Sequence, residues 1–176
     1  MDSVKTAYYG IAETEFGPML VAGDGRKLAA IKFNVDRKRM PDAVEALHRE
    51  LKGQFELVPD EGRIKPLISQ LNGYLAGKRT SFDVELDLSW MTPFRRRVME
   101  ECARIPRGKT STYGELARLA GNAKAFRAVG ATMATNPVPI VVPCHRVLGS
   151  GGGLHGFGGG LDMKARLLAL EGARLS

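Results

Sequence analysis

The segment Asn136-Pro-Val-Pro-Ile-Val-Val-Pro-Cys-His-Arg-Val147 sets the interpretation of the whole chain. Its prolines, at positions 137, 139 and 143, lack a backbone donor and fix φ, which predicts a rigid extended segment and excludes an α-helix. Cys144 and His145 lie directly after the last of these prolines. Neighbouring side chains of an extended segment point in opposite directions, so we expect a bridging water, rather than a direct hydrogen bond, to connect the thiol with the imidazole.

Cys144 is a candidate nucleophile. A lone cysteine is more often a packing residue, but here His145 and Arg146 follow it directly, and such neighbours favour the thiolate and lower its pKa. His145 is then the candidate general base. Cys102 falls on the apolar face of a helix that Thr92 would cap, so we expect it to be structural. Two cysteines make neither a disulfide framework nor a four-cysteine zinc site, and we expect no metal.

Two short helices are predicted upstream, over 113–120 and 123–134, with a tight turn at Gly121-Asn122 between them. This arrangement is typical of a helix-turn-helix, although any helical hairpin resembles it. This segment carries three basic side chains, which favour DNA binding: Arg118, Lys124 and Arg127. The second helix is lined with small residues: Ala125, Ala128, Gly130, Ala131 and Ala134. Close approach to a DNA groove or close packing against the core would both select them.

Downstream, residues 151–160 contain seven glycines. An amphipathic helix predicted over 161–170 follows at once, so a loop that brings its backbone close to a planar ligand explains them better than a flexible linker does. Glu171 ends that helix. A carboxylate there opposes the helix dipole, so we expect a compensating partner such as a histidine.

Composition and charge narrow the class of protein. The 176 residues, 44% hydrophobic and 26% charged, fit one globular domain or two small ones and exclude a disordered chain. No long apolar run or apolar signal core is present, so we expect no membrane association and a cytoplasmic location. Residues 1–88 hold 13 basic and 14 acidic side chains, whereas residues 89–176 hold 13 and 5. Such an acid-poor half predicts a polyanionic partner.

The first half of the chain alternates strands and helices. Strands are predicted over 8–13, 19–22, 28–33 and 81–86, and helices over 41–52 and 64–76. The first half of the chain contains no group of residues typical of a catalytic site. The predicted class is therefore α+β, with a structural α/β domain at 1–86, a linker at 87–92 and a mainly helical functional domain at 93–176.

Several segments together resemble the O6-alkylguanine-DNA alkyltransferases. They are Thr110-Ser-Thr-Tyr-Gly-Glu-Leu-Ala117, Asn136-Pro-Val-Pro139, Pro143-Cys-His-Arg-Val147 and Leu170-Glu-Gly172. The resemblance is strong over 90–173 and looser over 1–88. It implies an N-terminal domain like ribonuclease H with an antiparallel sheet, and a C-terminal domain that contains the helix-turn-helix.

The resemblance also implies a reaction. Cys144 would accept the alkyl group of O6-alkylguanine, and of O4-alkylthymine, as a permanent thioether, so that one molecule repairs one lesion. His145 would deprotonate Cys144 through water, with Glu171 orienting the imidazole and Asn136 bracing the same network. Tyr113 would donate a hydrogen bond to the leaving guanine. No cofactor is implied.

Double-stranded DNA is the implied partner, bound in its minor groove by a monomer. Arg127 would fill the gap that the extruded nucleotide leaves. The other implied DNA contacts are Thr110, Lys124, Ala125, Ala128 and Gly130. The implied substrate pocket consists of Met133, Pro139, Val147, Phe157, Gly158 and Lys164.

Two other functions fit part of the pattern. A helix-turn-helix protein that senses lesions without chemistry would bind DNA and leave its mass unchanged, but it would not need the Cys144–His145 pair. A hydrolase with a cysteine and a histidine would turn over repeatedly, but it would leave the basic half unexplained.

Phe157 stands where the family usually has tyrosine, and Gly158 where many members have serine. Phenylalanine still stacks on a base but donates no hydrogen bond, while Gly158 still offers its N–H to O6. We expect more room for groups larger than methyl. Ethyl and benzyl transfer should therefore be faster than in Phe157→Tyr, as measured by single-turnover kinetics; equal or slower transfer would contradict this.

Overall fold

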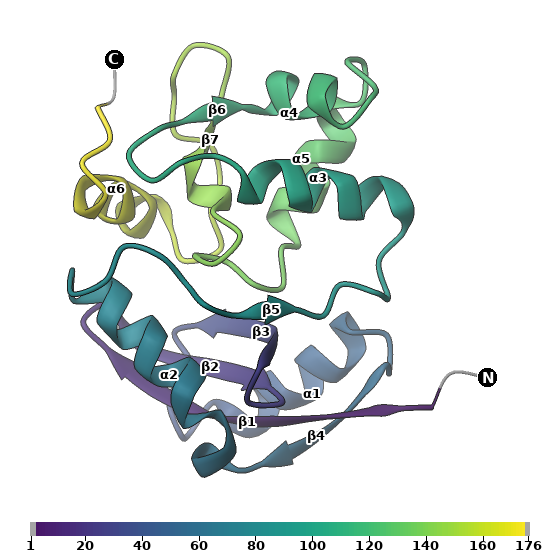
Figure 1. Ribbon diagram of the computed structural model, residues 1–176, viewed down its shortest axis with the longest axis vertical. Helices are drawn as coiled ribbons and strands as arrows, with labels where there is room; N and C mark the ends of the chain where they lie inside the picture. Colours follow the sequence, from purple (N-terminus) through teal and green to yellow (C-terminus); the bar gives the residue numbers. More distant parts are fainter. Residues whose placement is uncertain (1–2, 175–176) are drawn as a thin grey trace. The chain divides into compact units, whose positions relative to one another are not determined.

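The computed structural model describes residues 3–174. The chain divides after Trp90 into two compact units. The first unit is built on a five-stranded sheet with the strand order β4-β1-β2-β3-β5 (Figure 1). The strands are β1 (Lys5–Thr14), β2 (Gly17–Gly23), β3 (Lys27–Phe33), β4 (Phe55–Pro59) and β5 (Glu85–Leu86).

The sheet is mixed. Its three central strands are antiparallel, as the sequence predicts, but β4 runs parallel to β1 and β5 runs parallel to β3. Strand β4 is not predicted from the sequence, and β5 is shorter than the predicted strand over 81–86. Parallel neighbours require crossover connections, and the helices α1 (Met40–Glu50) and α2 (Glu61–Leu75) provide them.

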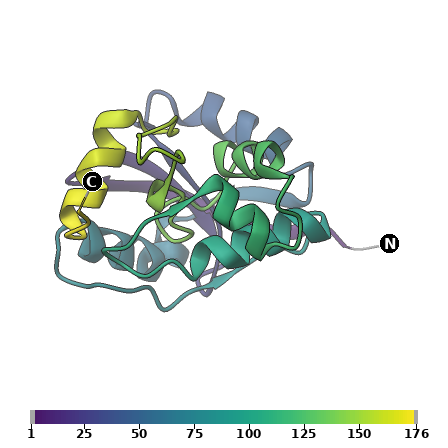
Figure 2. The same ribbon diagram turned by 90° about the horizontal axis from the view of Figure 1, so that it is seen from above.

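The two helices cover opposite faces of the sheet, with α2 in front and α1 behind in Figure 1 and on either side of the strands in Figure 2. On the α1 face, Leu47 and Leu51 pack against Leu20 and Phe55. On the other face, α2 begins three residues earlier than predicted, because the side chain of Asp60 accepts a hydrogen bond from the N–H of Arg63 and caps the helix.

Residues 87–90, which the sequence assigns to the linker, are tied to the first unit. The amine of Lys5 donates to both carboxylate oxygens of Asp87 at 3.0 Å and to Ser89 at 2.9 Å. The indole of Trp90 donates to the carbonyl of Asp87 and packs against the core of the unit. Burial raises the pKa of Asp87, but the hydrogen bonds and the charge of Lys5 outweigh it and hold this pKa below its usual range.

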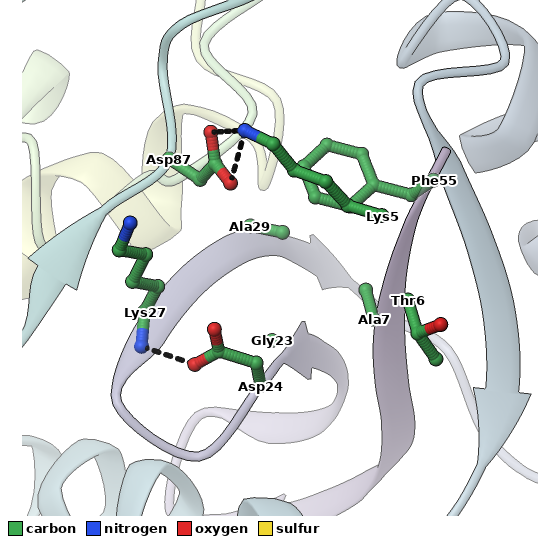
Figure 3. A pocket seen from close by; sticks show the side chains of 9 residues that line it. All are labelled: Lys5, Thr6, Ala7, Gly23, Asp24, Lys27, Ala29, Phe55 and Asp87. Carbon is green, nitrogen blue, oxygen red and sulfur yellow. Dashed lines mark hydrogen bonds and ion pairs between the residues drawn. The ribbon is translucent and has the colours of Figure 1, made fainter. Parts of the chain in front are cut away.

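A hollow of about 240 Å³ lies beside this ion pair (Figure 3). Its lining includes three residues with small or absent side chains, Ala7, Gly23 and Ala29. Lys5 already pairs with Asp87, and Asp24 accepts from the backbone of Lys27. These charged side chains at the hollow therefore already have partners within the fold.

The second unit is mainly helical. It contains α3 (Pro93–Ala103), β6 (Ser111–Thr112), α4 (Tyr113–Leu119), α5 (Phe126–Ala134), the 3-10 helix η1 (Cys144–Arg146), β7 (Val147–Leu148) and α6 (Leu161–Leu170). Strands β6 and β7 pair in parallel. Thr92 and Thr112 cap α3 and α4 by accepting from the N–H groups of Arg95 and Glu115.

The helix α5 is shorter than predicted. Residues 123–125 form a turn, in which the side chain of Asn122 accepts from the N–H of Lys124 and its carbonyl accepts from Ala125. An asparagine side chain competes in this way with helix formation. Lys124 and Ala125 therefore precede the helix.

The core of the second unit draws on every helix longer than one turn. Its fully buried members include Val98, Met99, Cys102, Leu116, Val129 and Leu167. Cys102 has no exposed surface, as expected of a structural thiol, and burial raises its pKa far above the ordinary value. Across residues 3–174, the helices are too short or too polar to cross a lipid bilayer.

Replacing Asp87 with asparagine tests how residues 87–90 are anchored. Because the pKa of Asp87 is lower in the folded chain than in the unfolded one, its contribution is complete above the unfolded value of about 3.9 and disappears as the pH falls through the folded value. Asp87→Asn should lower the free energy of unfolding by about 1–2 kcal/mol at pH 7, and the difference should shrink as the pH falls below about 3.9. Urea titration followed by the fluorescence of Trp90, the single tryptophan, measures it.

The matched control is Asp83→Asn, which alters an exposed carboxylate nearby in the sequence and should change stability little. A loss from Asp87→Asn that stays constant between pH 7 and about pH 2 would show that the ion pair does not anchor the segment.

Candidate active site

The proline-rich segment is folded back on itself, so the predicted extended conformation is wrong. Ile140 has a φ of 75°, and the N–H of Val142 donates to the carbonyl of Val138 at 3.0 Å. The N–H of Arg146 then donates to the carbonyl of Pro143 at 2.9 Å, which closes η1. Prolines exclude an α-helix but not these tighter turns, because the N–H groups that close them belong to other residues.

The short helix η1 sends its three side chains in different directions. A 3-10 helix has three residues per turn, so consecutive side chains lie about 120° apart. Cys144 lines a cavity, whereas His145 and Arg146 both reach Glu171 at the end of α6. The tight turn thus separates the thiol from the two groups that hold the carboxylate.

Glu171 accepts hydrogen bonds from both neighbours of the thiol. Its Oε1 lies 2.9 Å from Nε2 of His145 and 2.9 Å from Nε of Arg146, and its Oε2 lies 2.7 Å from Nη2 of Arg146. Arg146 also donates to the carbonyl of Ile105 at 2.6 Å. Glu171 therefore has the compensating partners that its place at a helix C-terminus requires.

This role of Arg146 is not among those predicted from the sequence. Its position next to Cys144 predicts a group that favours the thiolate, but in the structure the guanidinium forms a bidentate ion pair with Glu171. The pairing of Arg146 with Glu171 could have been predicted, because a carboxylate buried at a helix C-terminus needs a cation. Arginine matches the geometry of a carboxylate best.

The side chain of His145 is fully buried, and its imidazole is uncharged. Burial lowers the pKa of its imidazole, the charges of Arg146 and Lys164 lower it further, and Glu171 opposes them. An ionised carboxylate can only accept hydrogen bonds. Nε2 of His145 therefore carries a proton and donates the hydrogen bond to Glu171. Nδ1 is then a bare acceptor, buried and without a hydrogen-bond partner among residues 3–174.

The pKa of Cys144 moves in the opposite direction to the one predicted from its neighbours. Burial raises the pKa of the thiol, and this outweighs the hydrogen bond from Asn136, the charge of Lys164 and the N–H groups of Cys144 and His145, all of which lower it. The resting site is therefore a thiol beside a neutral imidazole. Reaction at sulfur requires a base to take the proton.

Asn136 is held in place by its own segment. Its side chain donates to the carbonyl of Val142 at 2.9 Å and accepts from the N–H of Val138 at 3.0 Å. Since it also hydrogen-bonds Cys144, it connects the folded proline segment with the thiol.

The thiol opens onto a cavity of about 360 Å³, within the size range of small-molecule sites. Its lining is Tyr113, Gly130, Met133, Ala134, Cys144, Gly156, Phe157 and Gly158. Met133, Phe157 and Gly158 belong to the pocket implied by the sequence. Gly130, which the sequence assigned to DNA contact, also lines it, and Ala134 and Gly156 were missed.

Three residues of the implied pocket lie behind the lining instead. Pro139 and Val147 are buried. The buried amine of Lys164 donates to the carbonyls of Val147 at 2.9 Å and His155 at 3.0 Å. Lys164 therefore ties β7 to the glycine-rich loop, and its charge acts on Cys144 from a distance.

Aromatic rings hold this loop near the cavity. The ring of Phe157 lies edge-on to His145, with centroids 6.4 Å apart, and His155 lies edge-on to Tyr113 at 6.3 Å. His155 packs directly over Gly149, where a Cβ atom would collide with the imidazole. Burial raises the pKa of Tyr113, and the neighbouring Cys144 raises it further.

The implied DNA contacts lie mostly at the surface. Thr110, Lys124, Arg127 and Ala128 are exposed, whereas Ala125 is half-buried. Arg118 is already paired with Glu115 at 2.6 Å, which weakens its case as a DNA contact. Within residues 3–174, no three histidine, cysteine or acidic side chains are grouped so that they could hold a metal ion.

Comparisons with known proteins identify the family. Residues 7–88 match the family description "6-O-methylguanine DNA methyltransferase, ribonuclease-like domain", and residues 93–173 match the DNA binding domain of the same family. The methylated-DNA–protein-cysteine methyltransferase of Methanosarcina acetivorans is 41% identical over 94% of this chain and 99% of its own length. The chain belongs to the methylated-DNA–protein-cysteine methyltransferase family.

Solved structures of this methyltransferase family share the fold. The O6-methylguanine methyltransferase of Mycobacterium tuberculosis aligns with a TM-score of 0.77 and 38% identity over 95% of this chain and 93% of its own. The Mycobacterium tuberculosis OGT protein in complex with DNA aligns with a TM-score of 0.78 and 39% identity, over 94% and 92% of the two chains. The α+β class with its two domains is thereby confirmed.

Glu171→Gln tests the buried ion pair. Removing one partner leaves the guanidinium of Arg146 buried without its counterion, so the free energy of unfolding should fall by about 3–5 kcal/mol. The matched control is Glu101→Gln, whose partner Arg104 is exposed and whose loss should stay below about 1 kcal/mol. Equal losses in chemical denaturation would mean that the Glu171 pair does not hold the site.

Proposed function

We propose that this protein repairs alkylated DNA by transferring the alkyl group from O6 of guanine to Cys144, once per molecule. The observation that carries the proposal is a cysteine thiol that opens onto a cavity beside a buried His145–Glu171 pair. Membership of the methylated-DNA–protein-cysteine methyltransferase family supports the same reaction.

Proton transfer comes first in the proposed reaction. Nδ1 of His145 accepts the proton of Cys144 through a bridging water, while Nε2 keeps its hydrogen bond to Glu171. The imidazolium that forms is unfavourable in a buried site, and the negative charge of Glu171 offsets it. Arg146 and the carbonyl of Ile105 keep the carboxylate in position.

Displacement at carbon follows. The sulfur of Cys144 forms a bond to the alkyl carbon as the bond from that carbon to O6 breaks, and the electron pair of the broken bond stays on O6. The N–H of Gly158 donates to this oxygen, and the hydroxyl of Tyr113 donates a hydrogen bond to the leaving guanine; both residues line the cavity. The guanine anion takes up a proton, which balances the one that Cys144 gave up, and leaves as neutral guanine. The thioether that remains could be cleaved only by expelling a thiolate from carbon, which is difficult, so the protein is consumed.

Phe157 provides the surface on which the base stacks. Its ring lines the cavity, and the glycines on either side keep the neighbouring backbone free of side chains. O4-alkylthymine presents a comparable alkyl ether, and we propose it as a second substrate.

We propose that DNA binds through its minor groove. The helix α5 exposes alanines that would let its backbone approach, and in this proposal the exposed Arg127 fills the gap left by the extruded nucleotide. Thr110 and Lys124, both exposed, are the proposed contacts to the DNA backbone, and the acid-poor second half of the chain attracts its negative charge. The Mycobacterium tuberculosis relative solved in complex with DNA supports this partner.

We also propose that the protein is a monomer and that it repairs DNA in the cytoplasm. Alkyl transfer needs a single chain, since the thiol, the base and the cavity lie in one unit. Both cysteines are free thiols, which fits a reducing compartment.

Intact-mass measurement tests the function. After incubation with a duplex that contains O6-methylguanine, the protein should gain the mass of one methylene, located on Cys144 by peptide mapping. Cys102→Ala is the matched control and should gain the same mass, because Cys102 is buried in the core, while Cys144→Ala should gain none.

Two results would contradict the proposal. An unchanged mass with tight binding to the duplex would indicate a protein that recognises the lesion without chemistry. Repeated turnover of an ester or amide with no added mass would indicate a hydrolase.

A further inference from the structure

Phe126 is a large apolar side chain with no role in the site described so far. It is the first residue of α5, and half of its surface is exposed. The other exposed positions of this helix are Arg127 and three alanines, Ala128, Ala131 and Ala134. The helix therefore begins with one exposed aromatic ring and one exposed cation, and its other exposed side chains are only methyl groups.

Helix geometry places Phe126 on the stripe that lines the cavity. Residues four, seven and eight positions further along share its face, and these are Gly130, Met133 and Ala134. All three line the cavity that contains Cys144. Phe126 therefore extends this wall by one helical turn, about 6 Å beyond Gly130. Arg127 points about 100° away from Phe126, close to the direction of Ala134 seven positions further along, and so lies at the edge of the same stripe.

Gly130 is not required by packing within the protein. A Cβ atom built on it would meet nothing within 4 Å, although glycine within a helix costs about 1 kcal/mol relative to alanine. Its position, between Phe126 and the rest of the cavity wall, leaves an open path along the helix. A path of this kind suits a group that passes from the DNA to the thiol.

We propose that Phe126 is a DNA contact that packs against the nucleotide as it leaves the duplex, while Arg127 fills the gap behind it. The inference rests on the proposed function, because it requires a base that travels from the helix to Cys144. Apolar side chains commonly insert at the minor groove, and a ring stacks on any base regardless of sequence. Contact with the nucleotide would also cover apolar surface that is now exposed to water.

Two substrates separate this role from the chemistry. A methylated guanine within a duplex must be extruded, whereas the free base O6-benzylguanine enters the cavity directly. Phe126→Ala should slow transfer from the duplex about 10-fold, within the range measured for stacking contacts, and change transfer from the free base less than about twofold. Phe126→Tyr keeps a ring and should restore most of the duplex rate.

Val4→Ala is the matched control, because Val4 is also exposed and apolar but belongs to the first unit. It should leave both rates unchanged. Equal duplex rates for Phe126→Ala and the unsubstituted protein would overturn the inference alone, as would an equal loss on both substrates. If the unsubstituted protein transfers from neither substrate, the proposed function fails and the inference fails with it.

Discussion

The carboxylate of Glu171 is the group on which the site depends. It is buried at the end of α6 and accepts hydrogen bonds from His145 and Arg146, so one side chain fixes the orientation of both neighbours of the thiol. Arg146 in turn holds the carbonyl of Ile105 after α3. A buried ion pair contributes little net stability, but removing one partner is costly, and here the pair determines where Cys144 points.

Burial gives the site a neutral resting state. It raises the pKa of Cys144 and lowers that of His145, so neither group is charged before substrate arrives. A neutral thiol reacts poorly with adventitious electrophiles. Charge separation is then needed only in the reaction, where Glu171 and the donors around the cavity stabilise it. This arrangement suits a protein that each reaction would consume.

The sequence predicts features that depend on local chemistry. The cap at Thr92, the buried position of Cys102 and the bounds of α6 were all predicted correctly, because helical spacing and capping residues determine them. The short turn η1 was not, since proline patterns do not distinguish an extended chain from tight turns.

Features that depend on burial and pairing could not be read from sequence. The direction of the Cys144 pKa shift depends on how much water the fold excludes, and the sequence shows only which residues are neighbours. The edge strand β4 pairs with β1 across about fifty residues, so its short sequence carries little signal. The cavity wall formed by Gly130 and Ala134 appears only once α5 is placed against Cys144.

Nitrogen-15 NMR of His145 tests the neutral resting state most directly. The account predicts that at pH 7.5 Nε2 carries a proton and Nδ1 carries none, because Glu171 accepts from Nε2 while burial disfavours the charged ring. The resonances are assigned by their loss in His145→Gln. An imidazole protonated on both nitrogens at this pH would show a charged ring at rest and would contradict the neutral resting state.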